Sequence, residues 1–433
     1  MRLTLEQHQV REIAWGSRTK LDLGVLTVDR DELVAELLRD ERLTSADLDL
    51  ASPGEACRMV QLFDVVEPRA RLEPAGADFP GILSPVQACG NGRTRVLRGA
   101  AVAVLDPTAP SAQLGRGLQA GHVLDMAPEV LLTQPRTGFS RRLPSTDVSL
   151  YAGLRHVVVV PRIAAGVSPD GASQALRVAS LRAAVYLAAH AGGGPPDDQQ
   201  VLELGPAPPD LPRVAYVYQL HSHQIPTLPG EPLLYGDNCR RLLPTLLHPN
   251  EVLDGAVVRS YYQLNMETYG IQNNAIILDL YRRHGRELNF VGVVVNVANQ
   301  MAEERERCTT MSANLVRWIL KADGAVFSKT IGGAPHVDMA LVAERCEELG
   351  VKTAMLVSIA GEGQDSALFN SPALDAIVSA ATVGTVALEP TERVIAGSPA
   401  LAEVAQGAMT VGAGRFVGSV DHLGAGRLTS ARY

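Results

Sequence analysis

The sequence predicts an α/β protein in which a β-rich N-terminal domain is followed by a Rossmann-like parallel sheet with helices on both faces. Two observations support this prediction. Short apolar or alternating segments, separated by Pro and Gly, dominate residues 1–150. Continuous apolar segments then alternate with helix-like segments over residues 213–400, a pattern typical of parallel strands that are buried on both faces.

The β-rich domain is expected to span residues 1–150. Its predicted strands are Gly24–Val28, Asp47–Leu50, Arg58–Leu62 and Val96–Leu105. Asp29 and Glu32 form a capping box that predicts a helix directly after the first of these strands. Pro-Gly and Gly-rich stretches separate the strands, so this part is predicted to be sheet and loop.

Residues 151–212 are expected to connect the two main parts. The apolar segment His156–Val160 predicts a strand, and the small residues of Ala172–His190 predict a long helix that ends at a Gly-rich stretch. Pro206–Pro212 is the best internal boundary because proline-rich joints are stiff and extended.

The parallel α/β domain is expected over residues 213–400, with a Gly-rich C-terminal segment over 401–433. Its predicted strands are Val214–Tyr218, Phe290–Asn296, Gly324–Ser328, Lys352–Ser358 and, more weakly, Ala376–Ala380 and Val386–Leu388. The predicted helices are Met301–Lys321, with a core stripe of Cys308, Met311, Leu315 and Trp318, and Val337–Leu349. We expect Val291–Val295 and Met355–Val357 to be buried neighbouring or near-neighbouring strands of one parallel sheet.

Composition limits the class of partner and the compartment. The net charge is −8 and no stripe of Lys or Arg occurs, so we expect neither nucleic acid nor membrane as a partner. No apolar run approaches the roughly 20 residues of a transmembrane helix, and no secretory signal is visible. Five widely spaced cysteines without a C-x-x-C pair predict free thiols in the cytoplasm.

Candidate chemical groups follow the predicted parallel strands, because ligands of such sheets bind beyond the carboxyl ends of the strands. His221 and His223 follow the strand that ends at Tyr218. An H-x-H pair on an extended segment places both imidazoles on one side, which suits a metal ion. The sequence identifies no third ligand, so we expect no metal and keep histidines that bond the backbone or a substrate as the alternative.

A second strand end leads into Gly332 and Gly333, followed by His336 and Asp338. Backbone N–H groups at a helix N-terminus can hold an anion, so these four residues form the predicted substrate-binding set. Tight turns that need positive φ are the alternative explanation of the two glycines.

Several long segments of the sequence resemble one protein family. They are Val65–Arg69, Phe79–Ile82, Gly92–Ala101, Leu243–Ala256 and Asp279–Gly292. In this order they are similar to the component B proprotein (α) subunit of the glycine, sarcosine and betaine reductases, to which the D-proline reductase proprotein is related. The resemblance extends from the N-terminus to about residue 390.

The resemblance implies a specific chemistry. Proproteins of the family cut themselves before an internal cysteine, the new N-terminal residue becomes an electrophilic pyruvoyl group, and a partner supplies a selenol or thiol. The resemblance implies that this cysteine lies a few residues after the family segment that corresponds to Asp254–Val258. In this chain, Arg259–Gly270 contains no cysteine. Ser260 and Thr268 carry the hydroxyls that could undergo the analogous acyl shift, and neither has the expected preceding residue. Pyruvoyl is therefore disfavoured, other cofactors stay open, and the chain is expected to remain uncut.

The predicted function is that of a subunit in a component-B-like complex, acting on the C–N bond of a small amino acid or amine without a pyruvoyl group. A second component-B-like subunit is the expected partner, which implies a hetero-oligomer. Two alternatives stay open. The chain is a non-catalytic scaffold for that partner, or it is a metal-dependent enzyme that uses His221 and His223.

The working site is expected where the loop of the two histidines meets Asp254–Tyr269 and the Gly332-Gly333 turn. Its predicted catalytic residues are His221, His223, Ser260, Tyr261 and Asn265. Imidazoles exchange protons near neutral pH, and the tyrosine and asparagine would orient a polar substrate. Histidines that cap a loop and tyrosines that fill a subunit interface are the alternative.

Overall fold

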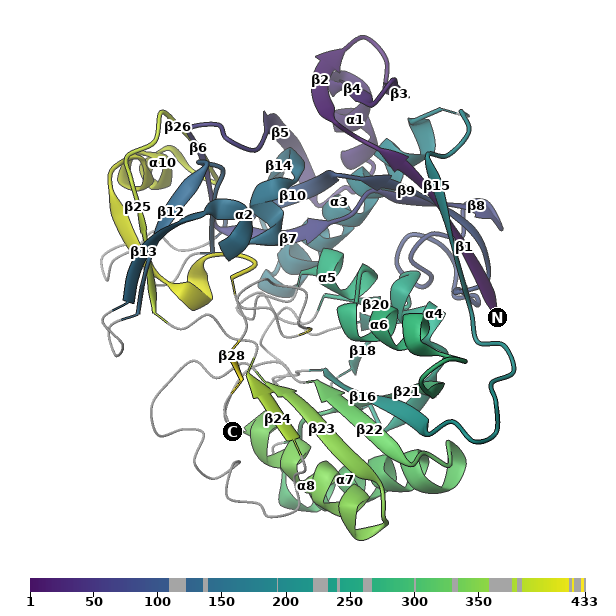
Figure 1. The fold of residues 1–433 in the computed structure, drawn as a ribbon. Helices are drawn as coiled ribbons and strands as arrows, with labels where there is room; N and C mark the ends of the chain where they lie inside the picture. Colours follow the sequence, from purple (N-terminus) through teal and green to yellow (C-terminus); the bar gives the residue numbers. More distant parts are fainter. Residues whose placement is uncertain are drawn as a thin grey trace.

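The structure is a computed structural model of the chain. It describes residues 1–108, 122–134, 139–192, 194–220, 233–239, 242–259, 267–299, 301–328, 334–357, 376–379, 384–419, 423 and 430–431. These residues form a mixed α/β protein with several sheets (Figure 1).

Two four-stranded sheets form the centre of the N-terminal half. The strands of the first sheet are, in spatial order, β15 (Asp198–Glu203), β1 (Arg2–Gln9), β9 (Gly92–Arg98) and β8 (Arg69–Glu73). Those of the second sheet are β5 (Leu43–Ala51), β14 (Arg155–Ile163), β10 (Ala100–Leu105) and β7 (Leu62–Val66). The strand predicted at Val96–Leu105 is two strands, because the chain turns between them at Gly99 with φ +84. A Cβ at Gly99 would lie 2.6 Å from the carbonyl oxygen of Val10, so glycine is required on both counts.

Smaller sheets surround this centre. They are β2 (Glu12–Gly16), β4 (Val25–Asp29) and β3 (Lys20–Asp22); β11 (Val123–Asp125), β6 (Cys57–Val60) and β26 (Arg393–Ala396); and β13 (Phe139–Pro144), β12 (Glu129–Gln134), β25 (Thr385–Leu388) and β27 (Met409–Gly412). The helical segments among them are α1 (Arg30–Leu37), α2 (Ser145–Val148), a 3-10 turn at Leu150–Gly153, α10 (Pro399–Gln406) and a 3-10 turn at Ala413–Arg415.

The strand predicted at Val386–Leu388 was wrongly expected in the parallel α/β part. The strand β25 instead pairs antiparallel with β12 and with β27. Its residues alternate between buried and partly buried, which is the period of a half-covered antiparallel strand. The chain therefore returns to the N-terminal sheets after the parallel sheet is complete (Figure 1).

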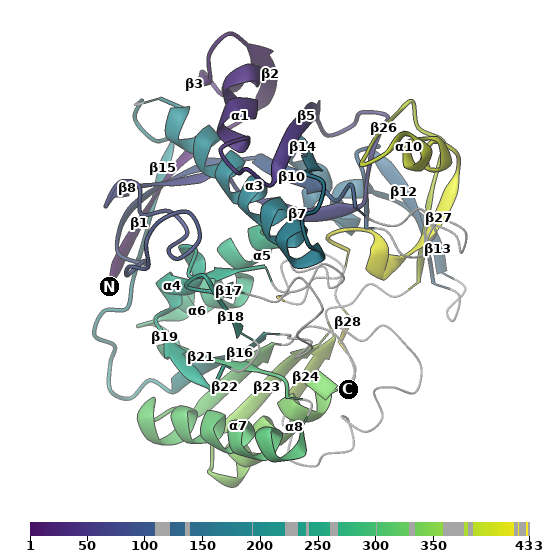
Figure 2. The same ribbon diagram turned by 180° about the vertical axis from the view of Figure 1, so that it is seen from behind.

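Helix α3 (Pro169–His190) packs against the second central sheet (Figure 2). It begins three residues before the prediction, because the Ser168 side chain accepts a hydrogen bond from the Gly171 amide and so caps the helix. Alanine and leucine side chains of α3 share one buried core with valines of β10 and β14. The strands β14 and β15, from the predicted connecting stretch, pair with β10 and β1.

The second half contains a seven-stranded sheet. Its order is β19 (Thr245–Leu247), β21 (Asn289–Val297), β16 (Arg213–Leu220), β22 (Gly324–Ser328), β23 (Lys352–Val357), β24 (Ala376–Ser379) and β28 (Ser430–Ala431). The five central strands are parallel, and the two outer ones are antiparallel to their neighbours. The predicted β21 and β23 lie in this one sheet, with β16 and β22 between them.

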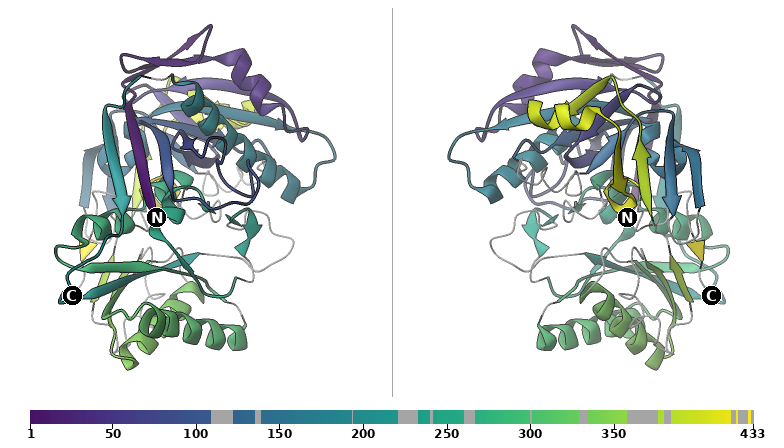
Figure 3. Two further views of the ribbon diagram at one scale, coloured as in Figure 1. Left: turned by 90° about the vertical axis from the view of Figure 1, so that its right-hand side faces the viewer. Right: turned by 90° about the vertical axis from the view of Figure 1, so that its left-hand side faces the viewer.

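Helices cover both faces of the sheet. They are α4 (Pro249–Leu253), α5 (Thr268–Gln272) and α6 (Ala275–Arg283) on one face, and α7 (Ala302–Asn314), a π turn at Leu315–Ile319 and α8 (Ala334–Glu348) on the other. Figure 1 shows α4–α6 between the sheet and the N-terminal half, with α7 and α8 on the outer face; Figure 3 shows the same layers from the side. A three-stranded sheet of β18 (Asp237–Asn238), β17 (Leu233–Leu234) and β20 (Val257–Val258) lies beside α4 and α5.

The helix predicted at Met301–Lys321 is shorter and ends in a different geometry. Cys308 is buried and Leu315 packs against the core, as the predicted stripe requires. Trp318 is 59% exposed, so this member of the stripe is wrong. The π turn at Leu315–Ile319 explains the difference, because an extra residue per turn rotates the following side chains away from the stripe.

Among the described helices, none combines the length and the apolarity that crossing a membrane requires. The domain boundaries expected at residues 150 and 212 stay a prediction.

Candidate functional site

Most of the predicted site falls outside the described residues. This applies to the expected catalytic residues His221, His223, Ser260, Tyr261 and Asn265, and to Gly332 and Gly333. Their meeting at one place stays a prediction. The residues that flank these segments are described, and they define the surroundings of the site.

His336 and Asp338 lie at the start of α8 and are buried. The Asp338 carboxylate accepts a hydrogen bond of 2.5 Å from the backbone N–H of Asn299 and another from the Arg305 guanidinium. Burial raises the pKa of Asp338, while these bonds oppose the rise. Asp338 thus joins the end of β21 to the starts of α7 and α8, and its role in substrate binding stays a prediction.

Five buried polar side chains meet where the N-terminal half contacts α5; we term them the junction cluster. They are Asp64 of β7, Arg177 of α3, Arg259 directly after β20, and Glu267 and Thr268 at the start of α5. None exposes more than 4% of its surface. Arg259 and Glu267 border residues 260–266 on either side, which is where the sequence predicts Ser260, so the junction cluster flanks the predicted site.

Asp64 organises this contact. Its carboxylate accepts a 2.9 Å bond from the Thr268 backbone N–H and a 2.6 Å bond from the Thr268 hydroxyl, and therefore caps α5. The Thr268 hydroxyl oxygen also accepts a 3.3 Å bond from the backbone N–H of Arg259. The two ends of the 260–266 segment are thereby held together.

Arg259 and Glu267 carry atoms without partners. The Arg259 guanidinium lies 5.0 Å from the centroid of the Phe63 ring, a cation–π contact. Its Nε and Nη1 atoms, and Oε2 of Glu267, are buried and have no hydrogen-bond partner in the described part of the chain. Buried polar groups are bonded in the large majority of cases, so these atoms of Arg259 and Glu267 are exceptions to the rule.

Burial shifts the pKa values of the cluster, and neighbouring charges modify these shifts. Burial raises the pKa of Glu267 to about 7, while Arg259 and a hydrogen bond from Tyr151 oppose the rise. Burial also raises the pKa of Asp64, opposed by Arg259 and by the bonds from Thr268. Burial lowers the pKa of Arg177 to about 10, so this guanidinium stays charged at neutral pH. Glu267 therefore exchanges a proton in the physiological range.

Buried ion pairs hold the chain on both sides of the cluster. On the C-terminal side, Glu67 accepts from Arg69 at 2.7 Å and from Arg98 at 2.6 Å, and Arg98 also donates to Asn273 at 2.6 Å. On the N-terminal side, Asp254 accepts from Arg71 at 2.6 Å, from the Thr94 hydroxyl and from the Gly90 N–H. Both networks join the N-terminal sheets to the segment 254–273 and fix its ends.

A close backbone contact supports the three-stranded sheet that precedes Arg259. A Cβ at Gly81 would lie 2.0 Å from the carbonyl oxygen of Tyr235, and one at Gly236 would lie 2.2 Å from that of Gly81. Phe79 and Tyr235 adopt positive φ values of 42 and 50. Non-glycine residues in this conformation are strained, and such strain is concentrated at functional sites.

The carboxyl ends of β16 and β22 form the other border of the site. Tyr216 and Ser328 share a hydrogen bond of 2.5 Å between their hydroxyls, and the Asn274 amide donates to Tyr216 at 3.4 Å. Next along β16, both amide atoms of buried Gln219 are unbonded among the described residues. In the strand order β21-β16-β22 this is the point where ligands bind to open parallel sheets.

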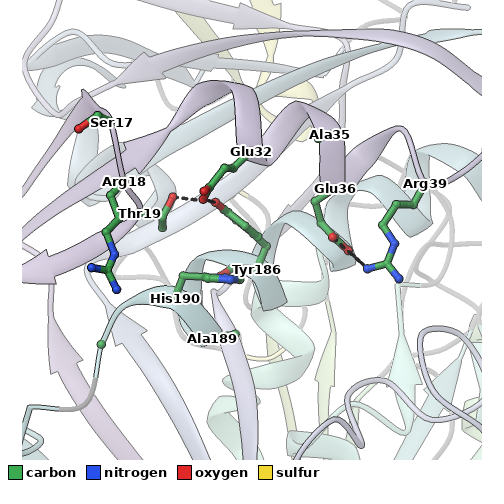
Figure 4. A pocket seen from close by; sticks show the side chains of 11 residues that line it. Ser17, Arg18, Thr19, Glu32, Ala35, Glu36, Arg39, Tyr186, Ala189 and His190 are labelled. Atoms are coloured by element: carbon green, nitrogen blue, oxygen red, sulfur yellow. Dashed lines mark hydrogen bonds and ion pairs between the residues drawn. The ribbon is translucent and has the colours of Figure 1, made fainter.

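A groove of about 820 Å³ lies between α1 and the C-terminal end of α3 (Figure 4). Thr19 and the Tyr186 hydroxyl share a bond of 2.9 Å, and Tyr186 donates to Glu32 at 2.8 Å. The polar groups of this groove are thus largely bonded to one another. The α3 residues that line it, Tyr186, Ala189 and His190, lie roughly 14–20 Å along the helix from Arg177, at 1.5 Å per helical residue, so the groove is separate from the junction cluster.

No group of three or more metal-ligating side chains is found in the described part of the chain. All five cysteines are buried, and none of them forms a disulfide bond. Burial raises the pKa of Cys57, Cys89 and Cys346 to about 12, which leaves these thiols protonated and unreactive at neutral pH.

Comparison with known proteins covers almost the entire chain. The family profile described as glycine/sarcosine/betaine reductase component B subunits matches residues 1–422. The chain belongs to this family. It is 32% identical to the "Glycine reductase complex component B subunits alpha and beta" of Acetoanaerobium sticklandii, over 97% of this chain and 93% of that protein.

Two further relatives are named as subunits of sarcosine and betaine reductase complexes. The chain is 30% identical to the "Sarcosine reductase complex component B subunit alpha" of Peptoclostridium acidaminophilum, over 88% of this chain and 85% of the relative. It is 28% identical to the "Betaine reductase complex component B subunit alpha" of the same organism, over 92% and 88%. No solved structure matches the chain.

In this component B family member, the absence of a pyruvoyl group derived from cysteine stays a prediction. Residues 259–270 contain no cysteine, and the five cysteines elsewhere are all buried. Thr268, one of the two hydroxyl residues considered there, is fully buried and hydrogen-bonded to Asp64.

Sequence reasoning missed the junction cluster. Asp64 and Arg259 each follow apolar residues, in Leu62-Phe63 and Val257-Val258, which would have signalled buried charges. Glu267 gave no such signal, because its burial arises from packing between distant parts of the chain.

Proposed function

We propose that this chain is a subunit of a component-B-like reductase complex that acts on the C–N bond of a small amino acid or amine without a cysteine-derived pyruvoyl group. Membership of the component B family supports the complex and the bond. The absence of cysteine between Val258 and Ile276 supports a route without pyruvoyl. The observation that carries the proposal is the junction cluster, which borders residues 260–266 with a charged guanidinium and a carboxyl group that titrates near neutral pH.

The expected partner is a second component-B-like chain, so the complex is a hetero-oligomer. A thiol or selenol of a partner would supply the nucleophile, as the family resemblance implies. Cysteines outside disulfide bonds favour a reducing compartment, and we place the complex in the cytoplasm. We also infer a Rossmann-like, doubly wound second half, because its parallel strands follow the order β21-β16-β22-β23-β24, which is the 2-1-3-4-5 order of flavodoxin-like sheets.

The test begins with the intact mass of the chain co-expressed with its partner. We expect one uncut chain, and no mass shift after treatment with hydroxylamine or borohydride, which react with pyruvoyl carbonyls. Fragments that end near residue 259 would contradict the proposal and would identify Ser260 as the precursor; Ser260→Ala would then abolish cleavage.

Activity is tested by amine release from glycine, sarcosine and betaine with a dithiol as reductant. Release by the uncut complex supports the proposal. A stable complex without release would indicate a scaffold. Replacing His221 and His223 with Ala, together with metal analysis, tests the metal-dependent alternative. This alternative predicts that the variant loses both its activity and its bound metal.

A further inference from the structure

The C-terminal end of α7 presents apolar side chains to the surface. The α-helix over Ala302–Asn314 passes into the π turn over Leu315–Ile319. Within this turn, Trp318 and Ile319 expose 59% and 61% of their surface. Such π turns are rare and are frequently found at functional positions. The geometry that removes Trp318 from the core therefore indicates a role for this side chain at the surface.

Trp318 lies at one end of an exposed stripe along α7. Glu303, Arg307, Thr310 and Asn314 precede it at spacings of three or four residues, and all four are exposed. This spacing places side chains on one face of a helix. The stripe is about 22 Å long, because consecutive helical residues rise 1.5 Å. Figures 1 and 2 show α7 and α8 on the outer side of the sheet, away from the N-terminal half.

The two ends of the α7 stripe carry opposite charges. Glu303 and Glu304 lie in the first turn of the helix. At the other end, the Arg317 guanidinium lies 5.5 Å from the centroid of the Trp318 ring, and the exposed Lys321 follows. An acidic and a basic end on one helix make the stripe complementary to a copy of itself that runs in the opposite direction.

Antiparallel packing of two copies about a two-fold axis matches both ends at once. In such a contact every residue pair occurs twice, so a match at one end is repeated at the other. An axis near Thr310 would bring Glu303 and Glu304 of one copy to Arg317 and Trp318 of the other. Parallel packing would instead place like charges together, which disfavours it.

The exposed apolar side chains meet in the same arrangement. Met301 directly precedes α7 and exposes 65% of its surface. The same axis would place it against Trp318 and Ile319 of the other copy. Contacts between a thioether and an aromatic ring are favourable, and Trp is enriched among the side chains that dominate binding energy at interfaces. The contact would thus contain two apolar anchors, each flanked by opposite charges.

We propose that two copies of this chain associate through the α7 stripe, antiparallel about a two-fold axis near Thr310. A second copy is the occupant that fits, because the charge pattern of the stripe is self-complementary. The net charge of −8 disfavours association of copies through arbitrary surfaces, so the opposed charges of this stripe give the contact its specificity. The interface is independent of the reaction that the complex catalyses.

Sedimentation of the purified chain and of its co-purified complex, over a concentration series, tests the association. We expect particles with two copies of this chain that dissociate on dilution. Trp318→Ala should weaken the association at least about thirtyfold, as expected for an interface side chain of large contribution that occurs twice. Val404→Ala is the matched control, because it shortens an apolar side chain on α10 that is 53% exposed. It should leave the association unchanged.

Charge exchange tests the antiparallel direction. Glu303→Lys and Lys321→Glu should each weaken the association, because each places like charges opposite one another. The double variant should recover affinity, because its exchanged charges are again opposite. Glu41→Lys, at an exposed position outside the stripe, makes the same charge change as Glu303→Lys and should have no effect. Added salt should weaken the wild-type association and leave the folded chain intact.

Crosslinking locates the two-fold axis. Thr310→Cys should crosslink to its own counterpart through a short bis-maleimide, because this residue lies at the proposed axis. Glu303→Cys should not, because the two copies of that residue would lie roughly 20 Å apart along antiparallel helices. The native cysteines are buried, so the introduced thiol is the accessible one. Crosslinking at Glu303→Cys and not at Thr310→Cys would contradict the arrangement.

Three results would overturn the proposal: a single copy per particle at every concentration, association that is unaffected by Trp318→Ala, or a double charge variant weaker than both single ones. If a different subunit, and not a second copy, protects the Trp318 fluorescence from quenching by acrylamide, that subunit occupies the stripe and the proposal fails. Thermal unfolding checks that each variant is folded. Should Trp318→Ala be unfolded, the charge and crosslinking variants, all at exposed positions, decide the question.

Discussion

The pKa of Glu267 predicts how the stability of the protein depends on pH. Burial raises this pKa from an ordinary value of 4.5 to about 7. The folded state therefore keeps its proton over a range in which the unfolded chain has lost it. Stability is fully present below pH 4.5 and is lost as the pH rises through about 7, after which it stays level. Glu267→Gln removes the titration but preserves the shape and a hydrogen-bond donor.

The magnitude follows from the size of the shift. A difference of about 2.5 pKa units corresponds to roughly 3 kcal/mol, because one unit is about 1.4 kcal/mol. At pH 5 the unfolded chain is already partly ionised, so the change between pH 5 and pH 8 is about 2–3 kcal/mol. The wild type should lose this amount relative to Glu267→Gln across the interval.

Urea unfolding at pH 5 and pH 8 measures this difference. The wild type, Glu267→Gln and the exposed control Glu41→Gln are compared at both values. Asp64 has a raised pKa as well, but it titrates in both chains and largely cancels in the comparison. The reasoning is refuted if the difference in unfolding free energy between wild type and Glu267→Gln is the same at both pH values.

Three further predictions concern stability and are measured by urea or thermal unfolding. Gly81→Ala should lower the free energy of unfolding by about 2–4 kcal/mol, because φ is positive there and the new Cβ would overlap with a facing carbonyl. Gly76→Ala, where φ is +72 and the space is open, should lower it by about 1 kcal/mol. Equal losses in the two variants would exclude the close contact at Gly81. Asp254→Asn should lower the free energy of unfolding by about 3 kcal/mol, because it breaks a buried ion pair. Asp279→Asn removes a member of an exposed ion pair and should change that free energy little. A larger loss for Asp279→Asn than for Asp254→Asn would contradict the burial of Asp254. Val294→Asp should cost about 3 kcal/mol or more as an unpaired buried charge, and a tolerated change would remove this residue from the core.

Strands of the parallel sheet were predictable because continuous apolar residues in the local sequence indicate their burial. Gly324–Ser328 is a strand with the bounds expected, and Val214–Tyr218 and Phe290–Asn296 each lie inside a slightly longer strand. Both faces of these strands are covered, so nearly every residue is apolar. One helix start was also readable from its capping residue, because Asp29 directly precedes α1 and accepts a hydrogen bond from the Glu32 backbone N–H.

Prediction failed where distant contacts decide the structure. Trp318 follows the stripe of an ideal helix, but the π turn before it changes the direction of its side chain. The strand at Thr385–Leu388 pairs with β12, more than two hundred residues earlier in the chain, and no local pattern reveals that partner. The same applies to Glu267, whose pKa depends on burial against a different half of the protein.

The junction cluster shows why the site requires both halves of the chain. The N-terminal half supplies Asp64 and Arg177, and the second half supplies Arg259 and Glu267. Water would screen these charges in either half alone, and Glu267 would then titrate as an ordinary carboxyl group. Packing of the halves removes that water, which raises the Glu267 pKa and strengthens the field of Arg259 in one step. The contact that buries the charges thus also sets the pKa of Glu267.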